Sequence, residues 1–291
     1  MRNILLVGFG GMGNAHFNSL FKKKEVHFDI YDSKKVIIKD PKKIKKITIL
    51  KKIQKNKSYF LYIDASYSRG RLKIIKKVMR SNKVKNLIIE KYPFSKVEHY
   101  QSFSGEFKNI LNRCYINTWA PKLAEKTKNI KNIQKIKVYI PENQFLTNII
   151  HYLYFIQIKL GDKIAYKKGS IKKIFESKRL GFNEIAGTFM FKCKNIEINF
   201  YSSKSSNKIL FYTKNYFLKI FFLKNNKIKI SENKNEHLIN FPLTKITNKI
   251  FYNQIIKKIN TRILPKYLEI EDLFIMIIKS IYKLNKKIKI T

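Results

Sequence analysis

LLVGFGGMGNAHFNSL, residues 5–20, joins an apolar run to a helical pattern through closely spaced glycines. Gly8, Gly10 and Gly13 have the spacing G-x-G-x-x-G. Between a strand and a helix, the first glycine permits a tight turn, the second lets a pyrophosphate approach the backbone, and the third lets helix and strand pack closely. The amides at the helix start then face the phosphates. We interpret the stretch as a dinucleotide-binding turn, the alternative being a purely structural turn.

On both sides of this turn, residues 1–119 alternate strand and helix patterns, which predicts a parallel sheet wrapped by helices. Further strands are predicted over 26–32, 58–66, 84–91 and 113–120, and helices over 71–82 and 95–107. Residues 120–291 differ in character. A strand over 133–141 and a helix over 144–161 precede a strand-rich tract of alternating, antiparallel type, and helices over 243–259 and 269–285 follow.

Composition bounds the function classes. The 291 residues, 44% of them hydrophobic, predict a folded chain of two domains. The net charge of +43 comes almost entirely from Lys scattered along the whole chain, as expected of an A/T-rich genome, so a dedicated nucleic-acid site is not expected. Cys114 and Cys193 are the only cysteines and lie far apart, which argues against disulfides and metal clusters. Without a signal-peptide pattern or a membrane-length apolar run, we expect a soluble, cytoplasmic protein.

Asp32 ends the second predicted strand, at the spacing expected of the acid that binds the adenosine ribose. A carboxylate there favours NAD over NADP by repelling a 2′-phosphate, although Lys34 and Lys35 follow closely and could accept one. The alternative is a strand-end acid in a local turn.

Together, GFGGMGNAH (residues 8–16, with His16 three residues after the last glycine) and LIIEKYPFS (87–95) resemble the Gfo/Idh/MocA oxidoreductases, the glucose-fructose oxidoreductase and inositol dehydrogenase family. The second stretch is similar to the family's Glu-Lys-Pro motif: Glu90 and Lys91 match, and a tyrosine precedes Pro93. The segment around His151 is similar to a family helix in which an Asp and a His four residues apart face the substrate. Here Thr147 stands in place of that Asp.

The resemblance implies an N-terminal Rossmann domain (1–119) and a C-terminal α/β domain (120–291) with a large, mostly antiparallel sheet that binds substrate and forms a homo-oligomer. It implies hydride transfer between NAD or NADP and a hydroxyl or keto carbon of a sugar or nucleotide sugar, in surface-glycan biosynthesis. Lys91 is expected to donate to the substrate oxygen and His151 to exchange its proton. The alternative is a protein of the same fold that binds the cofactor but has lost catalysis.

The remaining site predictions concern single residues. Ser66 follows a strand at the edge where the nicotinamide is expected. Trp119 could stack on a sugar, but packing at the domain junction is the preferred interpretation. His151 could equally be a satisfied core residue. The predicted cofactor-binding residues are Gly8, Phe9, Gly10, Gly11, Met12, Gly13, Asp32, Ser66, Glu90 and Lys91. The predicted substrate-binding residues are Lys91, Trp119, Asn148 and His151, and no metal site is predicted.

Overall fold

The computed structural model describes residues 2–20, 25–34, 36–38, 46–127, 130–178, 181–214, 217–223, 227–232, 235–241 and 265–290. The described residues belong to two compact units. Unit 1 comprises those up to 118 together with 265–271, and unit 2 comprises those from 119 to 241 together with 272–290. The helix predicted over 243–259, and Lys35, lie outside the described residues.

Unit 1 is built on a six-stranded sheet in the order β3-β2-β1-β5-β7-β8, in which every neighbouring pair is parallel. Its strands are β1 (Arg2–Val7), β2 (Val26–Tyr31), β3 (Ile47–Ile49), β5 (Leu61–Asp64), β7 (Leu87–Ile89) and β8 (Cys114–Ile116). Two short strands, β4 (Ser58–Tyr59) and β6 (Lys83–Val84), form a separate parallel pair. The carboxyl ends of the six parallel strands therefore share one edge.

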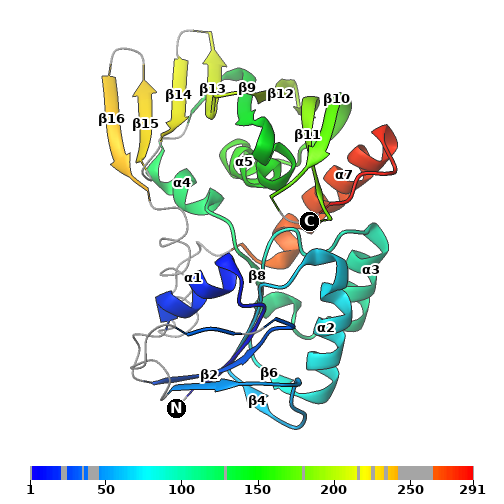
Figure 1. The fold of residues 1–291 in the computed structure, drawn as a ribbon. Coiled ribbons are helices and arrows are strands. Elements are labelled where there is room, and N and C mark those ends of the chain that lie inside the picture. Colours follow the sequence, from blue (N-terminus) through cyan, green and yellow to red (C-terminus); the bar gives the residue numbers. More distant parts are fainter. Residues whose placement is uncertain are drawn as a thin grey trace. The chain divides into compact units, whose positions relative to one another are not determined.

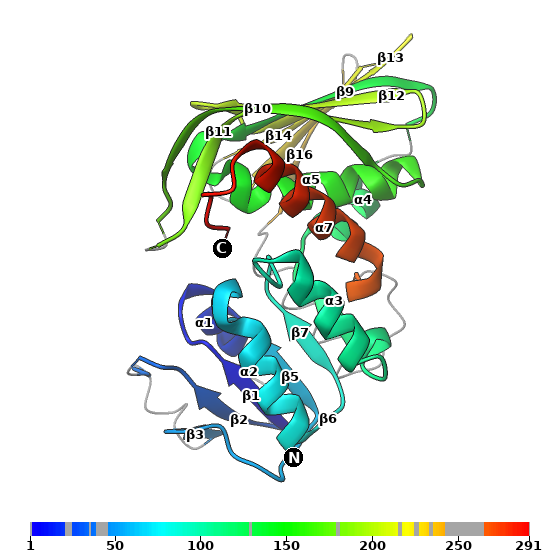
Figure 2. The ribbon, with the colours of Figure 1, turned by 90° about the vertical axis from the view of Figure 1, so that its right-hand side faces the viewer.

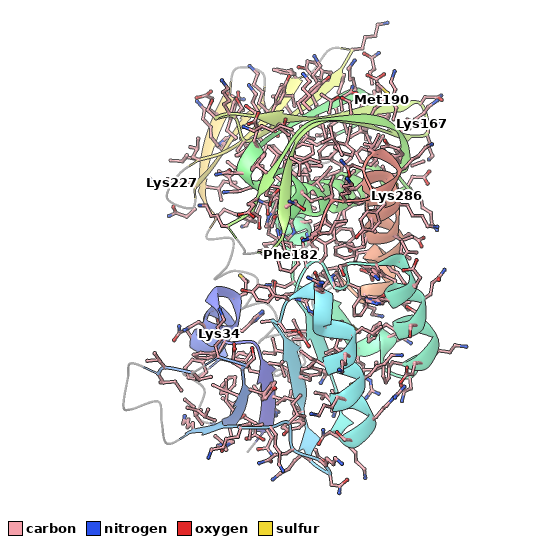
Figure 3. The ribbon with its side chains drawn as sticks, turned by 45° about the vertical axis from the view of Figure 1, so that its right-hand side comes forward. Lys34, Lys167, Phe182, Met190, Lys227 and Lys286 are labelled. Atoms are coloured by element: carbon pink, nitrogen blue, oxygen red, sulfur yellow. The ribbon has the colours of Figure 1, made fainter. Side chains whose placement is uncertain are left out.

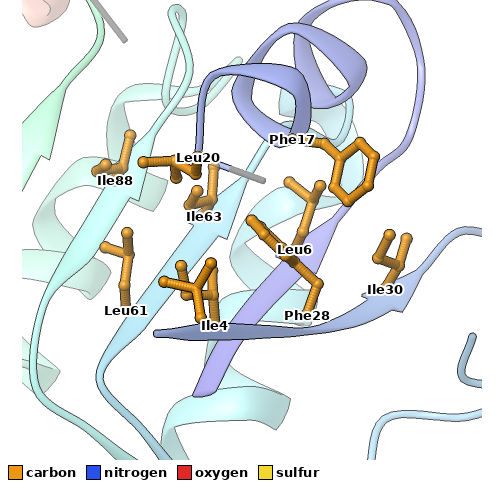
Figure 4. Close-up of a cluster of buried hydrophobic side chains, with 10 residues drawn as sticks. Ile4, Leu6, Phe17, Leu20, Phe28, Ile30, Leu61, Ile63 and Ile88 are labelled. Atoms are coloured by element: carbon orange, nitrogen blue, oxygen red, sulfur yellow. The ribbon is translucent and has the colours of Figure 1, made fainter. Parts of the chain in front are cut away.

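Helices cover both faces of this sheet. Figure 1 shows α1 (Gly11–Leu20) on one side and α2 (Ser68–Ser81) and α3 (Val97–Glu106) on the other; a single 3-10 turn, η2 (Leu111–Arg113), precedes β8. Phe17 and Leu20 of α1 point into a buried cluster with the apolar side chains of β1 and β2 (Figure 4). Residues 4–7 of β1 and 61–63 of β5 are buried without interruption, so these parts of the two strands appear in the sequence as continuous apolar runs.

The segment 265–271 adds to unit 1 from far along the chain. Tyr115 and Lys266 form an antiparallel bridge, and the Ile116 amide donates to the Pro265 carbonyl at 3.1 Å. The Tyr267 ring packs against Phe103 of α3 at 5.0 Å between centroids. These contacts complete the outer edge of the sheet beside β8.

Unit 2 is built on an eight-stranded sheet in the order β10-β11-β12-β9-β13-β14-β15-β16. The pair β9 and β12 is parallel and the other pairs are antiparallel. The strands are β9 (Ile133–Pro141), β10 (Ala165–Glu176), β11 (Asn183–Cys193), β12 (Ile196–Ser203), β13 (Lys208–Thr213), β14 (Phe217–Phe222), β15 (Lys227–Glu232) and β16 (Asn235–Asn240). The sheet is thus large, mixed and mostly antiparallel.

The helices of unit 2 lie on one side of its sheet (Figure 2). They are α4 (Ala120–Lys126), α5 (Phe145–Leu160), which follows the 3-10 turn η3 (Glu142–Gln144), and the part of α7 (Tyr267–Leu284) from Asp272 onward. Ile136, Val138 and Ile140 of β9 are fully buried, whereas the residues between them are half-buried. Met190 of β11 lies across from Asn199, which lies across from Lys137, so it belongs to the same outer face (Figure 3).

The predicted fold class is confirmed: a helix-wrapped parallel sheet is followed by a unit with a large, mostly antiparallel sheet. The strand predicted over 133–141 and the helix predicted over 144–161 match β9 and α5 closely, and Gly161 ends α5 in the left-handed conformation. The strands predicted over 58–66 and 84–91 are each broken into two short strands that pair in different sheets. The helix α4 was not predicted, because its seven residues are too few to show a period.

Candidate functional site

The glycine turn after β1 is held by contacts that only glycine allows. Gly8 has φ +85°, and a Cβ there would lie 2.7 Å from the backbone of Ala65, just after β5. A Cβ on Gly13 would lie 1.9 Å from the Gly8 carbonyl oxygen. The first and third glycines therefore pack the start of α1 directly onto the turn. The Gly8 amide also donates to the Tyr31 carbonyl at the end of β2, at 2.8 Å.

Gly10 differs from these two, because a Cβ there would meet no atom of the described residues within 4 Å, its chain neighbours aside. The described part of the fold does not demand glycine at this position, and it leaves space beside Gly10 for a ligand. Gly11 and Met12 form the first turn of α1, whose amides lack helical acceptors. A dinucleotide's pyrophosphate fits such a turn, since it needs close backbone approach and unpaired amides.

Asp32 follows β2 and is tied to the same turn. Its carboxylate accepts the Phe9 amide at 2.5 Å and the Lys34 amide at 2.8 Å, one on each oxygen. The side chain is half-buried. Each carboxylate oxygen accepts more than one hydrogen bond, so acceptor positions remain for ribose hydroxyls. Both interpretations of Asp32, a turn residue and a ribose acceptor, are compatible with these contacts.

Ser66 lies at the end of β5, one strand along the edge from the glycine turn. Its amide donates to Asp64 Oδ1 at 3.0 Å, and its hydroxyl donates to the same oxygen. Asp64 is fully buried and also accepts the Tyr62 hydroxyl. Burial, followed by the Asp64 charge, raises the pKa of Tyr62 well above its ordinary value. Ser66 is thus fixed by a buried carboxylate at the predicted nicotinamide edge.

Glu90 follows β7 and is the centre of a buried polar cluster. Its Oε1 atom accepts from His16 Nε2 on α1 and from Asn117 Nδ2 after β8, both at 2.6 Å. All three side chains are less than a tenth exposed. Burial raises the pKa of the Glu90 carboxyl, but the His16 and Asn117 hydrogen bonds and the Arg71 charge together outweigh it, and the net direction is downward. Glu90 is therefore an ionised anchor between α1 and the sheet edge.

Asn117 contributes a feature that the sequence did not suggest. Its Oδ1 atom is buried and has no hydrogen-bond partner within the described part of the chain. A buried acceptor left unpaired costs about 1–3 kcal/mol. The position after β8 therefore offers an acceptor for a donor that the described residues do not supply.

Lys91 is half-buried and directly follows Glu90, with a cis peptide bond to Tyr92. The end of β7 places it at the carboxyl edge of the parallel sheet, on the strand next to β5. Ligands of open parallel sheets bind outside this edge. Along this edge of unit 1 lie Asp32 after β2, the glycine turn after β1, Ser66 after β5 and Lys91 after β7.

In unit 2, His151 and Trp119 are packed together. The Trp119 ring lies 5.3 Å from the His151 ring and about as close to Tyr152 and Phe222. Trp119 is 7% exposed and His151 6%. The packing interpretation of Trp119 agrees with these contacts. Asn148, one turn before His151 on α5, is half-buried and donates to Gln144 Oε1 at 3.1 Å.

Thr147, four residues before His151, is engaged by a carboxylate from another element. Glu184 of β11 accepts the Thr147 hydroxyl on Oε1 and the Leu146 and Thr147 amides, at 2.8 and 3.3 Å, on Oε2. Glu184 is 2% exposed. It caps the first turn of α5 from a distance of 37 residues in sequence, which no local pattern could reveal.

Arg71, Asn117 and Glu184 are the polar residues that sequence reasoning missed. Arg71 alone carried a signal, because it falls on the buried stripe of α2 with Ile75 and Val78. Among the described residues, no group of three or more metal-ligating side chains is arranged to hold a metal ion. Nor does the described chain contain a helix with the length and apolarity needed to cross a bilayer.

Comparison with solved structures gives matches over nearly the whole chain. The dehydrogenase MviM from Clostridium difficile has 16% identity and a TM-score of 0.65, covering 96% of this chain and 99% of its own. A putative myo-inositol dehydrogenase from Sinorhizobium meliloti has 9% identity, a TM-score of 0.65 and full coverage of both chains. The 3-ketoreductase KijD10 from Actinomadura kijaniata, solved with TDP-benzene and NADP, has 9% identity and a TM-score of 0.63, covering 98% and 97%.

At these identities the likeness establishes the fold. No protein-family model matches the sequence, and no curated protein sequence matches it. These neighbours are described as a dehydrogenase, a putative myo-inositol dehydrogenase and a 3-ketoreductase, and the chain has the two-domain fold that they share.

Proposed function

We propose that this protein is an oxidoreductase that uses NAD or NADP to interconvert a hydroxyl and a keto group on a sugar or nucleotide sugar. The observation that carries the proposal is the glycine turn: Gly8 and Gly13 are required by the chain's own packing, whereas Gly10 faces open space. A turn closed on the protein side and open on the other is what a bound pyrophosphate needs. The nucleotide ligand and NADP of KijD10 support the same class of ligands.

In this proposal residues 1–119 bind the dinucleotide, and residues 120–291 bind substrate and form a homo-oligomer through the large sheet. Gly8, Phe9, Gly10, Gly11, Met12 and Gly13 hold the pyrophosphate, Asp32 the adenosine ribose, and Ser66, Glu90 and Lys91 the nicotinamide end. The Asp32 carboxylate favours NAD, because it would repel a 2′-phosphate. When bound, the nicotinamide supplies the hydride acceptor or donor.

In this proposal, side chains of the protein stabilise the reacting oxygen and transfer the hydroxyl proton of the substrate. The Lys91 ammonium would donate a hydrogen bond to the reacting oxygen and stabilise negative charge developing on it. His151 would exchange the hydroxyl proton, with Asn148 contacting the sugar and Trp119 packing against the His151 ring. The proposed biological setting is surface-glycan biosynthesis.

Titration of the purified protein with NADH and NADPH, followed by nicotinamide fluorescence, tests cofactor binding, and a panel of sugar nucleotides with NAD or NADP tests turnover. We expect NADH to bind more tightly than NADPH. Lys91→Ala should lower kcat by about 10²- to 10⁴-fold, a much larger loss than its loss of NADH affinity. Lys77→Ala on the exposed side of α2 is the matched control. Failure to bind either cofactor would contradict the proposal.

A second candidate is a cofactor-binding protein of this fold without catalysis. Thr147, which stands where the resembled family has an Asp, is bonded to Glu184, and this observation favours it. Under this candidate NADH binds, but no sugar nucleotide changes the nicotinamide absorbance. Turnover that Lys91→Ala removes would exclude it.

A further inference from the structure

Arg71 is an unusual residue for this chain. Only seven of the 62 Lys and Arg residues are Arg. Among the described residues, Arg71 is the one Lys or Arg whose side chain is buried, at 2% exposure. It belongs to the apolar stripe of α2, one turn before Ile75. A charged group is retained on such a stripe only when buried partners satisfy it.

The partners of Arg71 come from two strand ends. Its Nε donates to Asp64 Oδ1 at 3.1 Å, and its Nη2 donates to the Ser66 carbonyl, both just at the end of β5. Its Nη1 donates to the carbonyls of Glu90, Tyr92 and Pro93, the first at 2.5 Å and the last at 3.1 Å. One guanidinium therefore joins the end of β5 to the turn after β7.

The turn after β7 is the segment that carries Lys91. The carbonyls of Glu90, Tyr92 and Pro93 all accept hydrogen bonds from Arg71. Arg71 therefore fixes the backbone on both sides of Lys91. The buried Asp64 carboxylate balances the positive charge of the guanidinium. A Lys at position 71 could keep this charge, but its single ammonium cannot reproduce a planar fork of five donors.

We propose that Arg71 is a positioning residue, which sets the place of the Lys91 side chain by holding the turn at 90–93 against the end of β5. The inference rests on the proposed role of Lys91 in turnover. It assigns Arg71 no contact with substrate or cofactor. A misplacement of about 1 Å at a reacting group is enough to cost about 10²-fold in rate.

Arg71→Lys in the full-length protein tests the proposal, with Arg80→Lys as its matched control. Arg80 lies on the same helix, is exposed, and pairs only with Glu106 among its described contacts. For Arg71→Lys we expect faster amide hydrogen exchange in the peptide containing residues 90–95, and unchanged exchange in residues 5–16. We further expect kcat to fall about 10²-fold while NADH affinity stays within about twofold. Arg80→Lys should change none of these quantities.

A second measurement separates positioning from general damage. If Arg71→Ala folds, added methylguanidine at millimolar concentration should restore part of its kcat, because the guanidinium acts only by its donors. If neither Arg71 variant folds, Asp64→Asn, which keeps the side-chain volume but removes the balancing charge, should show the same exchange and kcat pattern in weaker form.

Equal exchange and equal kcat in Arg71→Lys and wild type would overturn the proposal, as would a loss of NADH affinity as large as the loss of kcat. Absence of NADH binding or turnover in the wild-type protein would instead refute the proposed function. The exchange measurement would still decide in that case whether Arg71 holds the turn.

Discussion

Two substitutions in the glycine turn should affect different properties: Gly13→Ala should lower stability, and Gly10→Ala should lower NADH affinity. In Gly13→Ala the new Cβ lies 1.9 Å from the Gly8 carbonyl oxygen, about 1.5 Å closer than the 3.4 Å at which ordinary contact begins. The turn cannot give way easily, because Gly8 itself lies against the Ala65 backbone. Relief requires α1 to move away from β1, and such overpacking costs about 1–3 kcal/mol. We expect the upper end of that range.

A loss of about 3 kcal/mol lowers Tm by about 6–12 °C at this size of domain. In Gly10→Ala the Cβ meets no atom of the described residues within 4 Å beyond its chain neighbours, so the free energy of unfolding should change by less than about 1 kcal/mol. The same Cβ would occupy the space proposed for the pyrophosphate. NADH affinity should therefore fall at least tenfold, or about 1.4 kcal/mol.

Differential scanning fluorimetry and NADH titration together measure both effects. Gly105→Ala, on α3, is the control. Outside its own helix turn, its Cβ also meets none of the described residues within 4 Å, so Tm and NADH affinity should both be retained. Unchanged NADH affinity in Gly10→Ala would refute the assignment of the turn to a pyrophosphate. A wild-type Tm in Gly13→Ala would refute the packing argument itself.

Three further predictions concern buried groups. Glu184→Ala, which removes the cap of α5, should lower the free energy of unfolding by about 1–3 kcal/mol, measured by urea denaturation, and an unchanged midpoint would contradict the capping role. The folded-state pKa of Glu90 lies below its ordinary value of 4.5, so its pairing with His16 stabilises the fold above that pH and is lost as the pH falls through the lowered pKa; Glu90→Gln should flatten this acid limb in thermal scans from pH 6 to pH 3, and an equally steep limb would count against it. Burial is the largest cause that raises the pKa of both Cys114 and Cys193, so neither thiol should react with a disulfide reagent at pH 8 until denaturant is added, and rapid labelling of the native protein would disprove this.

Features that depend on neighbouring residues could be predicted from the sequence, whereas features that depend on distant residues could not. The turn at Gly8, Gly10 and Gly13 was readable because three neighbouring residues and their flanking apolar run contain the whole motif. The strand β9 and the helix α5 were readable because hydrophobic period alone specifies them. The short strands β4 and β5, and likewise β6 and β7, were each predicted as one strand, because a break of one or two residues is too short to show in the apolar pattern.

Strand and helix patterns in the sequence were enough to predict the fold class, and local spacing was enough to propose the glycine turn and Asp32 as candidates. Glu90 and Lys91 were proposed from their resemblance to a family motif. The contacts that hold these residues follow from the tertiary structure. The guanidinium of Arg71 meets carbonyls 19 to 22 residues away, and the Glu184 carboxylate meets an amide 38 residues away. Such pairings form when separate strands end at one edge or one strand packs under a helix, and a chain rich in polar side chains offers too many candidate partners for spacing to select them.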